Sequence, residues 1–464
     1  MTKPMGLHTY LNKKTSIIPL IAFRIIFGML LLIGSIRFVS YGWVDRLYIK
    51  PQFYFSFIDF IKPLPGIWMY LPFSLVIIGS IGIVLGAFYR LSTQITFISF
   101  TYIELLDKTN YLNHYYFISL VLFLLCISPA HKYFSLDVKR KPSLKEVEIP
   151  LGSIFLIKFQ LTVVYLFAGI AKISPDWLLH AQPLHIWLQA YRDIPILGSL
   201  FSSKLTAYAF SWFGCIYDCT IPFLLIYSST RKIAFVCVII FHVITWLLFP
   251  IGIFPWVMIF STLVFFPAHF HSKWITYLQQ IIPIKKHKES KIEIHKDRSS
   301  KGKSTRLTFI VACYVIIQII IPLRYLISNP RELNWHEEGM RFSWRVMLIH
   351  KEGHATFFAK DPKTGKEIQL RNEEYLTDNQ IDQMSTQADM IVQFTQYIKT
   401  QLELGTLKTN KEKIRIINPV INAEVFVSLN GRESQIFVSK KHQLQLEKYT
   451  FSPHKWLSPF DNSL

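Results

Sequence analysis

The chain has 464 residues, of which 51% are hydrophobic and 15% aromatic, and it carries a formal net charge of +20. Several apolar runs are long enough to cross a bilayer core of roughly 30 Å, so the composition excludes a soluble globular protein and predicts a polytopic membrane protein. Residues 329–464 hold 18 basic and 17 acidic residues, which leaves almost all of the positive charge on the membrane half. There it would meet anionic lipid head groups from short loops, and we therefore expect the lipid bilayer rather than nucleic acid as a partner.

The N-terminal segment MTKPMGLHTYLNKK is basic, but the apolar run after it is a full span without a small-residue cleavage site, so no cleaved signal peptide is expected. Hydrophobic windows predict nine membrane spans, at residues 16–37, 68–88, 93–107, 113–129, 153–173, 206–227, 232–249, 252–268 and 307–327. A cytoplasmic N-terminus then puts these inter-span loops inside: 89–92, 130–152, 228–231 and 269–306. The last carries ten basic residues against three acidic ones, as the positive-inside rule favours.

This topology divides the chain into a helical membrane domain, residues 1–328, and an exterior domain, residues 329–464, which would be periplasmic in a bacterium and lumenal in a eukaryote. The fold class is thus a polytopic α-helical membrane protein of about nine spans with a C-terminal extramembrane β-rich domain. All five cysteines lie in apolar segments, at Cys126, Cys215, Cys219, Cys237 and Cys313. Neither a disulfide framework nor a metal site is expected from their spacing.

The exterior domain is predicted to be mostly strand with one helix. Residues 340–350, MRFSWRVMLIH, alternate apolar and polar side chains, and residues 355–370 and 423–439 each indicate a hairpin, the second with an Asn-Gly turn at 430–431. Between the hairpins, Thr377 and Gln380 predict a capping box that opens an amphipathic helix ending near residue 404.

Ionisable and amide side chains gather at compatible depths in several predicted spans, with Asn113, His114 and Lys172 near the outer face and His242 at middle depth. Asn113, His114, Lys172 and His242 are expected to line one cavity, because intramembrane polar groups usually face the bundle interior. A lysine desolvated there can act as a base, while a histidine and an amide stabilise the oxyanion left behind. The residues alone therefore predict a proton-abstracting site for an amphiphilic ring compound.

Simpler interpretations stay open for each of these residues. Lys172 could extend to the interface beside Trp177, His114 could cap its helix, and His242 could be a satisfied buried histidine. Asp218 and Glu104 are expected to pair with buried cations and support the bundle. Asp107 and Lys108 could form a surface pair at a turn.

Five motifs occur in order and resemble the vitamin K-dependent gamma-carboxylase family: LLDKTNYLNHYYFISL (105–120), YLFAGIAKISPDW (165–177), FHVITWLLFPIGIFPWVM (241–258), GMRFSWRVMLIHK (339–351) and the ending VSLNGRESQIFVS…FSPHKWLSP. The resemblance covers most of the chain from about residue 20. It implies an integral membrane carboxylase of the lyase class that oxygenates a reduced naphthoquinone to its 2,3-epoxide. The base formed then removes a gamma-proton from a peptide glutamate, and carbon dioxide adds to the carbon.

The resemblance also implies roles for single residues. Lys172 would deprotonate the hydroquinone, His114 would assist it, and Asn113 would orient the ring oxygens. The remaining predicted quinol contacts are Asp107, Lys108, Trp177 and His242. A glutamate-binding segment would contain Phe342, Trp344 and His350, with Phe342 at a position where animal members carry tyrosine and Arg345 where they carry an acid.

The implied cofactor is reduced vitamin K, a menaquinol-type naphthoquinol in a bacterium, with O2 and CO2 as co-substrates and no metal. The implied partner is a glutamate-containing protein or peptide. Two alternatives stay open: a quinol epoxidase that does not carboxylate glutamate, and a non-enzymatic lipid-binding or transport protein in which Lys172 and His114 hold an anionic head group.

Overall fold

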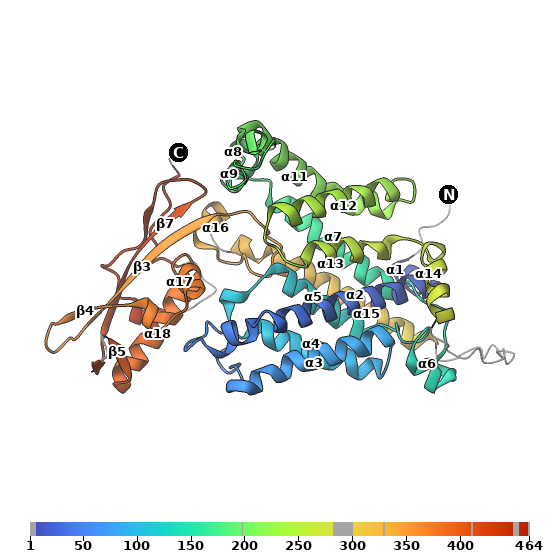
Figure 1. The fold of residues 1–464 in the computed structure, drawn as a ribbon, viewed down its shortest axis with the longest axis horizontal. Helices are drawn as coiled ribbons and strands as arrows, with labels where there is room; N and C mark the ends of the chain where they lie inside the picture. Colours follow the sequence, from blue (N-terminus) through green and yellow to red (C-terminus); the bar gives the residue numbers. More distant parts are fainter. Residues whose placement is uncertain are drawn as a thin grey trace.

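The computed structural model describes residues 6–196, 198–281, 300–327, 330–409, 412–448 and 454–462. Long helices run roughly side by side along the molecule, and a β-sheet flanked by two helices lies at one end of them (Figure 1). The first helix, α1 (Leu7–Asn12), lies at the opposite end. The fold class predicted from the sequence, a polytopic helical membrane protein with a β-rich extramembrane domain, is confirmed.

Six helices in the described part are long and apolar enough to cross a membrane, or seven if a bent pair counts as one span. The six correspond to α2 (Ile18–Ser40), α3 (Tyr70–Leu85), α7 (Gly152–Ala171), α11 (Lys204–Ile226), α12 (Arg231–Leu248) and α15 (Ser300–Leu323), with the last span running from Thr305 to Ile327. The bent pair joins Phe254–Phe265 to Ala268–Leu278 at an angle of 111°, and it includes α13 (Phe254–Ser261) and α14 (Ala268–Ile281).

Two further helices, α4 (Tyr89–Leu105) and α5 (Asn113–Ile127), occupy the third and fourth predicted spans but are shorter. Every predicted span therefore corresponds to a helix. By length and composition, however, only six or seven of the described helices are able to cross a membrane, fewer than the nine predicted. The shortness of α4 and α5 has a structural reason: their connecting turn leaves the bundle early and packs against the exterior helices. Helices α3 and α4 pack closely at Gly79 of α3. A Cβ there would lie 2.0 Å from the Thr96 hydroxyl oxygen of α4, so this packing requires glycine.

The loops predicted to be cytoplasmic gather at the end of the bundle away from the sheet. Helices α6 (Leu136–Arg140) and α14 both lie at this end, with α14 next to α1 (Figure 1). Strands β1 (Lys14–Ser16) and β2 (Glu148–Pro150) pair antiparallel and tie the start of α2 to the start of α7. Much of the most basic predicted loop, residues 282–299, lies outside the described residues.

The exterior domain is built on an antiparallel sheet of order β4-β3-β7-β8. Its strands are β3 (Lys351–Lys360), β4 (Glu367–Leu370), β7 (Val420–Leu429) and β8 (Gln435–Val438), with a separate pair β5 (Leu407–Thr409) and β6 (Glu412–Ile414). Alternate residues of β3 and β7 are buried under α17 (Asp378–Met384) and α18 (Ala388–Leu404), so the sheet has one covered face. Both predicted hairpins are confirmed, and Asn430 and Gly431 have the positive φ that a tight turn needs.

Two sequence expectations in this domain are wrong. The capping box of Thr377 and Gln380 is present, but the helix it opens ends at Met384 and a second one starts at Ala388. Residues 340–350 do not form a strand; three of them, Phe342, Trp344 and Met347, have positive φ. The backbone of this segment bonds to side chains at the start of α5 and in the turn before it: the Tyr111 hydroxyl accepts from the Phe342 amide, and the Asn113 side-chain amide donates to the Arg345 carbonyl.

The loop between α2 and α3 completes the exterior domain. Phe55 is buried in its core, and Gln380 and Gln393 donate hydrogen bonds to the carbonyls of Phe53 and Ser56. The predicted division at residue 328 therefore omits a segment that packs with residues 329–464. Short helices complete the outer end of the bundle and the link to the sheet: α8 (Pro175–His180), α9 (Leu184–Gln189), α10 (Gly198–Ser202) and α16 (Leu333–His336).

Candidate functional site

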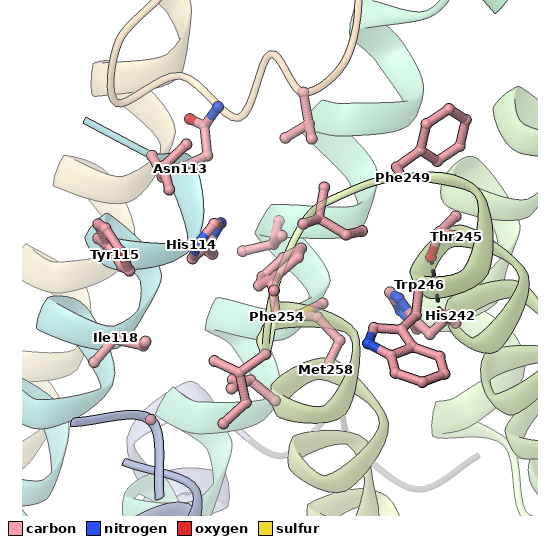
Figure 2. A pocket seen from close by; sticks show the side chains of 18 of the residues that line it. Asn113, His114, Tyr115, Ile118, His242, Thr245, Trp246, Phe249, Phe254 and Met258 are labelled. Carbon is pink, nitrogen blue, oxygen red and sulfur yellow. Dashed lines mark hydrogen bonds between the residues drawn. The ribbon is translucent and has the colours of Figure 1, made fainter. Parts of the chain in front are cut away.

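A cavity of about 810 Å³ lies between α2, α4, α5, α7, α11, α12 and α13. Its wall is mostly aliphatic and aromatic, which suits an apolar ring compound. Figure 2 shows part of it, with His114 pointing inward from α5 and Phe254 and Met258 entering from α13. The charged and polar side chains on the wall include Arg37, Ser35, Glu104, Asn113, His114, Lys172, Asp218, His242 and Thr245.

Lys172 follows the last residue of α7 and forms an ion pair inside the protein. Its Nζ lies 2.7 Å from Oδ2 of Asp218 on α11 and 3.4 Å from the carbonyl oxygen of Ala168, and it faces the Trp177 ring at 5.3 Å. The side chains of Lys172 and Asp218 are only 7% and 6% exposed. The lysine side chain is therefore buried and paired inside the protein, and the pairing expected for Asp218 is confirmed with Lys172 as the cation.

Small residues bring the two helices of this pair together. A Cβ at Gly169 on α7 would lie 2.6 Å from the Cys219 sulfur and 2.7 Å from the Cys219 backbone nitrogen, so glycine permits this approach. Beyond Lys172 the chain turns at Ser174, whose hydroxyl accepts from the Trp177 amide. The Trp177 indole then donates to the Ser211 carbonyl on α11 at 2.8 Å, which fixes the ring beside the ammonium.

Asn113 and His114 open α5 on another part of the wall. The His114 ring lies parallel to Phe254 with centroids 5.1 Å apart and meets Tyr115 edge to face. Within the described ranges no hydrogen-bond partner is present for its ring nitrogens, so they are free to bind a ligand. Asn113 accepts from Tyr111 at 3.1 Å and donates to the Arg345 carbonyl at 3.2 Å, which ties this helix start to the segment leading into β3.

His242 lies deeper on α12 and is already satisfied by the protein. Its Nε2 is 2.9 Å from the hydroxyl of Tyr165 on α7, and its carbonyl accepts from Thr245 (Figure 2). The geometry matches the simpler interpretation of a buried, hydrogen-bonded histidine that also borders the cavity.

Glu104 is a buried carboxyl on the wall whose setting differs from the expectation. The Ser119 hydroxyl donates to its Oε2 at 2.7 Å, whereas its Oε1 has no hydrogen-bond partner in the part of the chain that the structure describes. The buried cation expected beside it is not found among those residues. Sequence reasoning treated Glu104 as a structural support and missed that it borders the cavity; its signal was a lone acid near the outer end of an amphipathic helix.

Asp107 and Lys108, predicted to contact the quinol, are not among the residues that line this cavity. Asp107 accepts from Thr109 within its own turn and from Gln380 of α17 at 3.0 Å. Lys108 forms an ion pair with Asp389 of α18 at 3.0 Å. The turn between α4 and α5 directs both side chains toward the exterior domain and away from the bundle.

The predicted glutamate contacts also lie off the wall. Phe342 packs against Phe57, Tyr111 and Tyr116, and Trp344 is buried and stacks on Tyr116. His350 accepts from the Trp187 indole at 3.3 Å and lies near Glu352. From the same segment only Val346 and Met347 border the cavity.

The fold and the cavity together define a polytopic membrane protein with a buried polar site beneath an extramembrane domain. Residues 12–270 match the family model of the HTTM domain, and residues 303–463 match that of the vitamin K-dependent gamma-carboxylase lumenal domain. The chain belongs to the vitamin K-dependent gamma-carboxylase family, and the resemblance inferred from its motifs is confirmed. No solved structure matches it.

Proposed function

We propose that the protein is an integral membrane, vitamin K-dependent gamma-glutamyl carboxylase with quinol epoxidase activity. The observation that carries the proposal is the Lys172–Asp218 pair on the wall of an apolar cavity large enough for a naphthoquinol ring. The reduced naphthoquinone would supply, with O2, the strong base that removes the gamma-proton of glutamate before CO2 adds. Family membership and the unpartnered His114 ring support the same function.

Lys172 must present a neutral amine to remove a proton. Its Nζ contacts the Asp218 carboxylate, so in this proposal the neutral amine arises by proton transfer through that contact. Asp218 Oδ2 lies 2.7 Å from Nζ and can accept one ammonium proton. The freed amine can then take the proton of a ring hydroxyl, which makes Asp218 a partner in proton transfer as well as a support for the helices.

His114 would donate a hydrogen bond to the ring oxygen while stacking on Phe254, which holds its imidazole in one plane. Asn113 is engaged on both sides of its amide, so its role in this proposal is to fix the start of α5. Trp177 would shield the ammonium, and His242 with Tyr165 would bound the cavity.

In this proposal the N-terminus is cytoplasmic and the exterior domain meets its glutamate-containing substrate outside the membrane. A second candidate, quinol epoxidation without carboxylation, is favoured by one observation: Phe342, Trp344 and His350 all lie away from the cavity wall. In a transport or lipid-binding role, Lys172 would hold an anionic head group and would need only its charged form, with no proton transfer.

The decisive experiment supplies purified protein in lipid nanodiscs with reduced naphthoquinone and oxygen and measures the 2,3-epoxide by mass spectrometry. A glutamate peptide and labelled bicarbonate test carboxylation in the same reaction. Lys172→Ala should abolish epoxide formation. Lys158→Ala, which changes a lysine on the same helix that faces Phe265 and not the cavity, should leave it intact. Absence of epoxide from folded wild-type protein across several quinones would overturn the proposal.

A further inference from the structure

Arg37 is a cavity residue that the proposed chemistry does not use. It lies in the last turn of α2, and its guanidinium faces the rings of Tyr41 and Trp43 at 5.2 and 5.4 Å. Among the described residues it has no acidic partner. Glu104 borders the same cavity, yet its bonded oxygen is held by Ser119 and not by the arginine.

A lysine and an arginine border this cavity, and they differ in their partners. Lys172 forms an ion pair with Asp218, whereas the guanidinium of Arg37 has aromatic rings and no carboxylate beside it among the described residues. Aromatic rings offset part of the free-energy cost of removing a cation from water. A carboxylate offsets more of it, because the guanidinium donates two parallel N–H bonds to the two carboxylate oxygens. The wall therefore offers one binding site for an anion that the protein itself does not fill.

Arg37 lies at the end of the bundle that is next to the exterior domain, where a peptide substrate would bind. Helix α2 runs toward the sheet end of the molecule (Figure 1), and the loop after it contains Phe53, whose carbonyl accepts a hydrogen bond from Gln380 of the exterior helix α17. Gly252, in the turn after α12, lies beside the Arg37 guanidinium, since a Cβ there would be 3.6 Å from its Nη1. This glycine has φ +62° and leaves space beside the guanidinium.

We propose that Arg37 binds the side-chain carboxylate of the glutamate substrate and so selects glutamate over glutamine. The inference rests on the proposed function for its biological meaning. It also replaces the predicted glutamate contacts, which lie off the cavity wall. A carboxylate at Arg37 leaves the gamma-carbon inside the cavity that also contains Lys172 and His114.

The test measures binding and needs no turnover. The probe is a fluorescent, end-blocked pentapeptide with a single Glu, compared with the same peptide carrying Gln, on the full chain in nanodiscs of neutral lipid. Wild-type protein should bind the Glu peptide roughly tenfold or more tightly, as expected for a charge-assisted pair. Arg37→Gln should remove this preference, and Arg37→Lys should retain part of it.

Arg46→Gln is the matched control, because Arg46 lies on the same side of the bundle but does not border the cavity. It should keep the full preference. If wild-type protein shows no preference for Glu, or Arg37→Gln keeps it, the inference is wrong. An effect of Arg37→Gln confined to binding of anionic phosphatidylglycerol would also overturn it, since the arginine would then be a lipid contact.

Epoxide formation without peptide is measured in parallel to separate the two proposals. Epoxide formation together with loss of the Glu preference in Arg37→Gln supports both. Epoxide formation with no Glu preference overturns the inference and leaves the proposed epoxidase. A Glu preference that depends on Arg37 in a protein that forms no epoxide leaves the inference standing while the proposed function fails.

Discussion

The Lys172–Asp218 pair allows the structural and chemical roles of one contact to be measured separately. Asp218→Asn leaves the ammonium facing a neutral amide, and Lys172→Met leaves the carboxylate without its cation. Removing one member of a buried charged pair costs about 3–5 kcal/mol, whereas a neutral hydrogen bond between membrane helices is worth about 0.6 kcal/mol on average. Because both side chains are 7% exposed or less, we expect each single variant to lose about 3–5 kcal/mol of the free energy of unfolding.

The double variant Lys172→Met/Asp218→Leu removes both charges and restores apolar packing, so it should recover most of the lost stability. It should not recover epoxide formation, because the base is gone. The assay is reversible unfolding of each variant in the same detergent by intrinsic tryptophan fluorescence, alongside epoxide yield at saturating quinol. A loss near 0.6 kcal/mol in both single variants would refute the charged-pair reasoning and show that the two groups already share a proton as a neutral pair.

Three further outcomes follow from the described contacts. His114→Ala should lose most epoxide formation with little loss of thermal stability, since its ring makes aromatic contacts with Phe254 and Tyr115 but no hydrogen bond in the described part of the chain. His242→Ala breaks the hydrogen bond to Tyr165, so it should lower the melting temperature more and epoxide formation less when both are measured on the same protein. Glu104→Gln should raise the melting temperature, because a neutral amide costs less to bury than a carboxyl with one unpartnered oxygen; a lower value would show that the charge is used. Burial alone would raise the pKa of Asp389, but the charges of Arg341 and Lys108 outweigh it and hold that pKa well below its usual range, so its stabilisation is complete above about pH 4 and is lost as pH falls further. Lys108→Met should therefore make the exterior domain susceptible to acid-stable protease at a higher pH than in wild type.

Much of the architecture follows from composition alone. Apolar runs give the membrane helices, and the charge of the loops separates the two ends of the bundle. The bend of 111° after Phe265 could not be predicted, because an apolar run with a proline at residue 267 is compatible with either one span or a broken one. Hydropathy also fails to identify α4 as a span, because its polar side chains lower the mean hydropathy. Tyr89, Arg90 and Glu104 of this helix form hydrogen bonds with α5.

The candidate site was predictable where sequence depth determined the position. Asn113, His114 and Lys172 lie near the outer ends of their helices and His242 lies deeper on α12, and all four border one cavity. Partner choice was not predictable, since Asp218 is 46 residues from Lys172 and the sequence offered no reason to prefer one buried cation over another.

Asp107 and Lys108 lie away from the cavity for a different physical reason. They belong to the same motif as His114, but the short turn between α4 and α5 directs their side chains toward the exterior domain. Their partners Gln380 and Asp389 lie more than 270 positions along the chain, in a domain whose docking no local pattern encodes. Motif neighbours are therefore weaker guides to a site than residues at equal depth on separate helices.

The irregular segment from Met340 to His350 shows why the site and the exterior domain form one unit. Its alternating apolar residues satisfy two surfaces: Phe342 and Trp344 pack on the tyrosines of the α5 region, while Met347 borders the cavity. A regular strand would place all of one face against a single partner, so positive φ values are needed to turn successive side chains to different sides. The Arg345 carbonyl accepts a hydrogen bond from Asn113, which borders the cavity next to His114. Displacement of this segment would therefore change the cavity wall even if the sheet stayed intact.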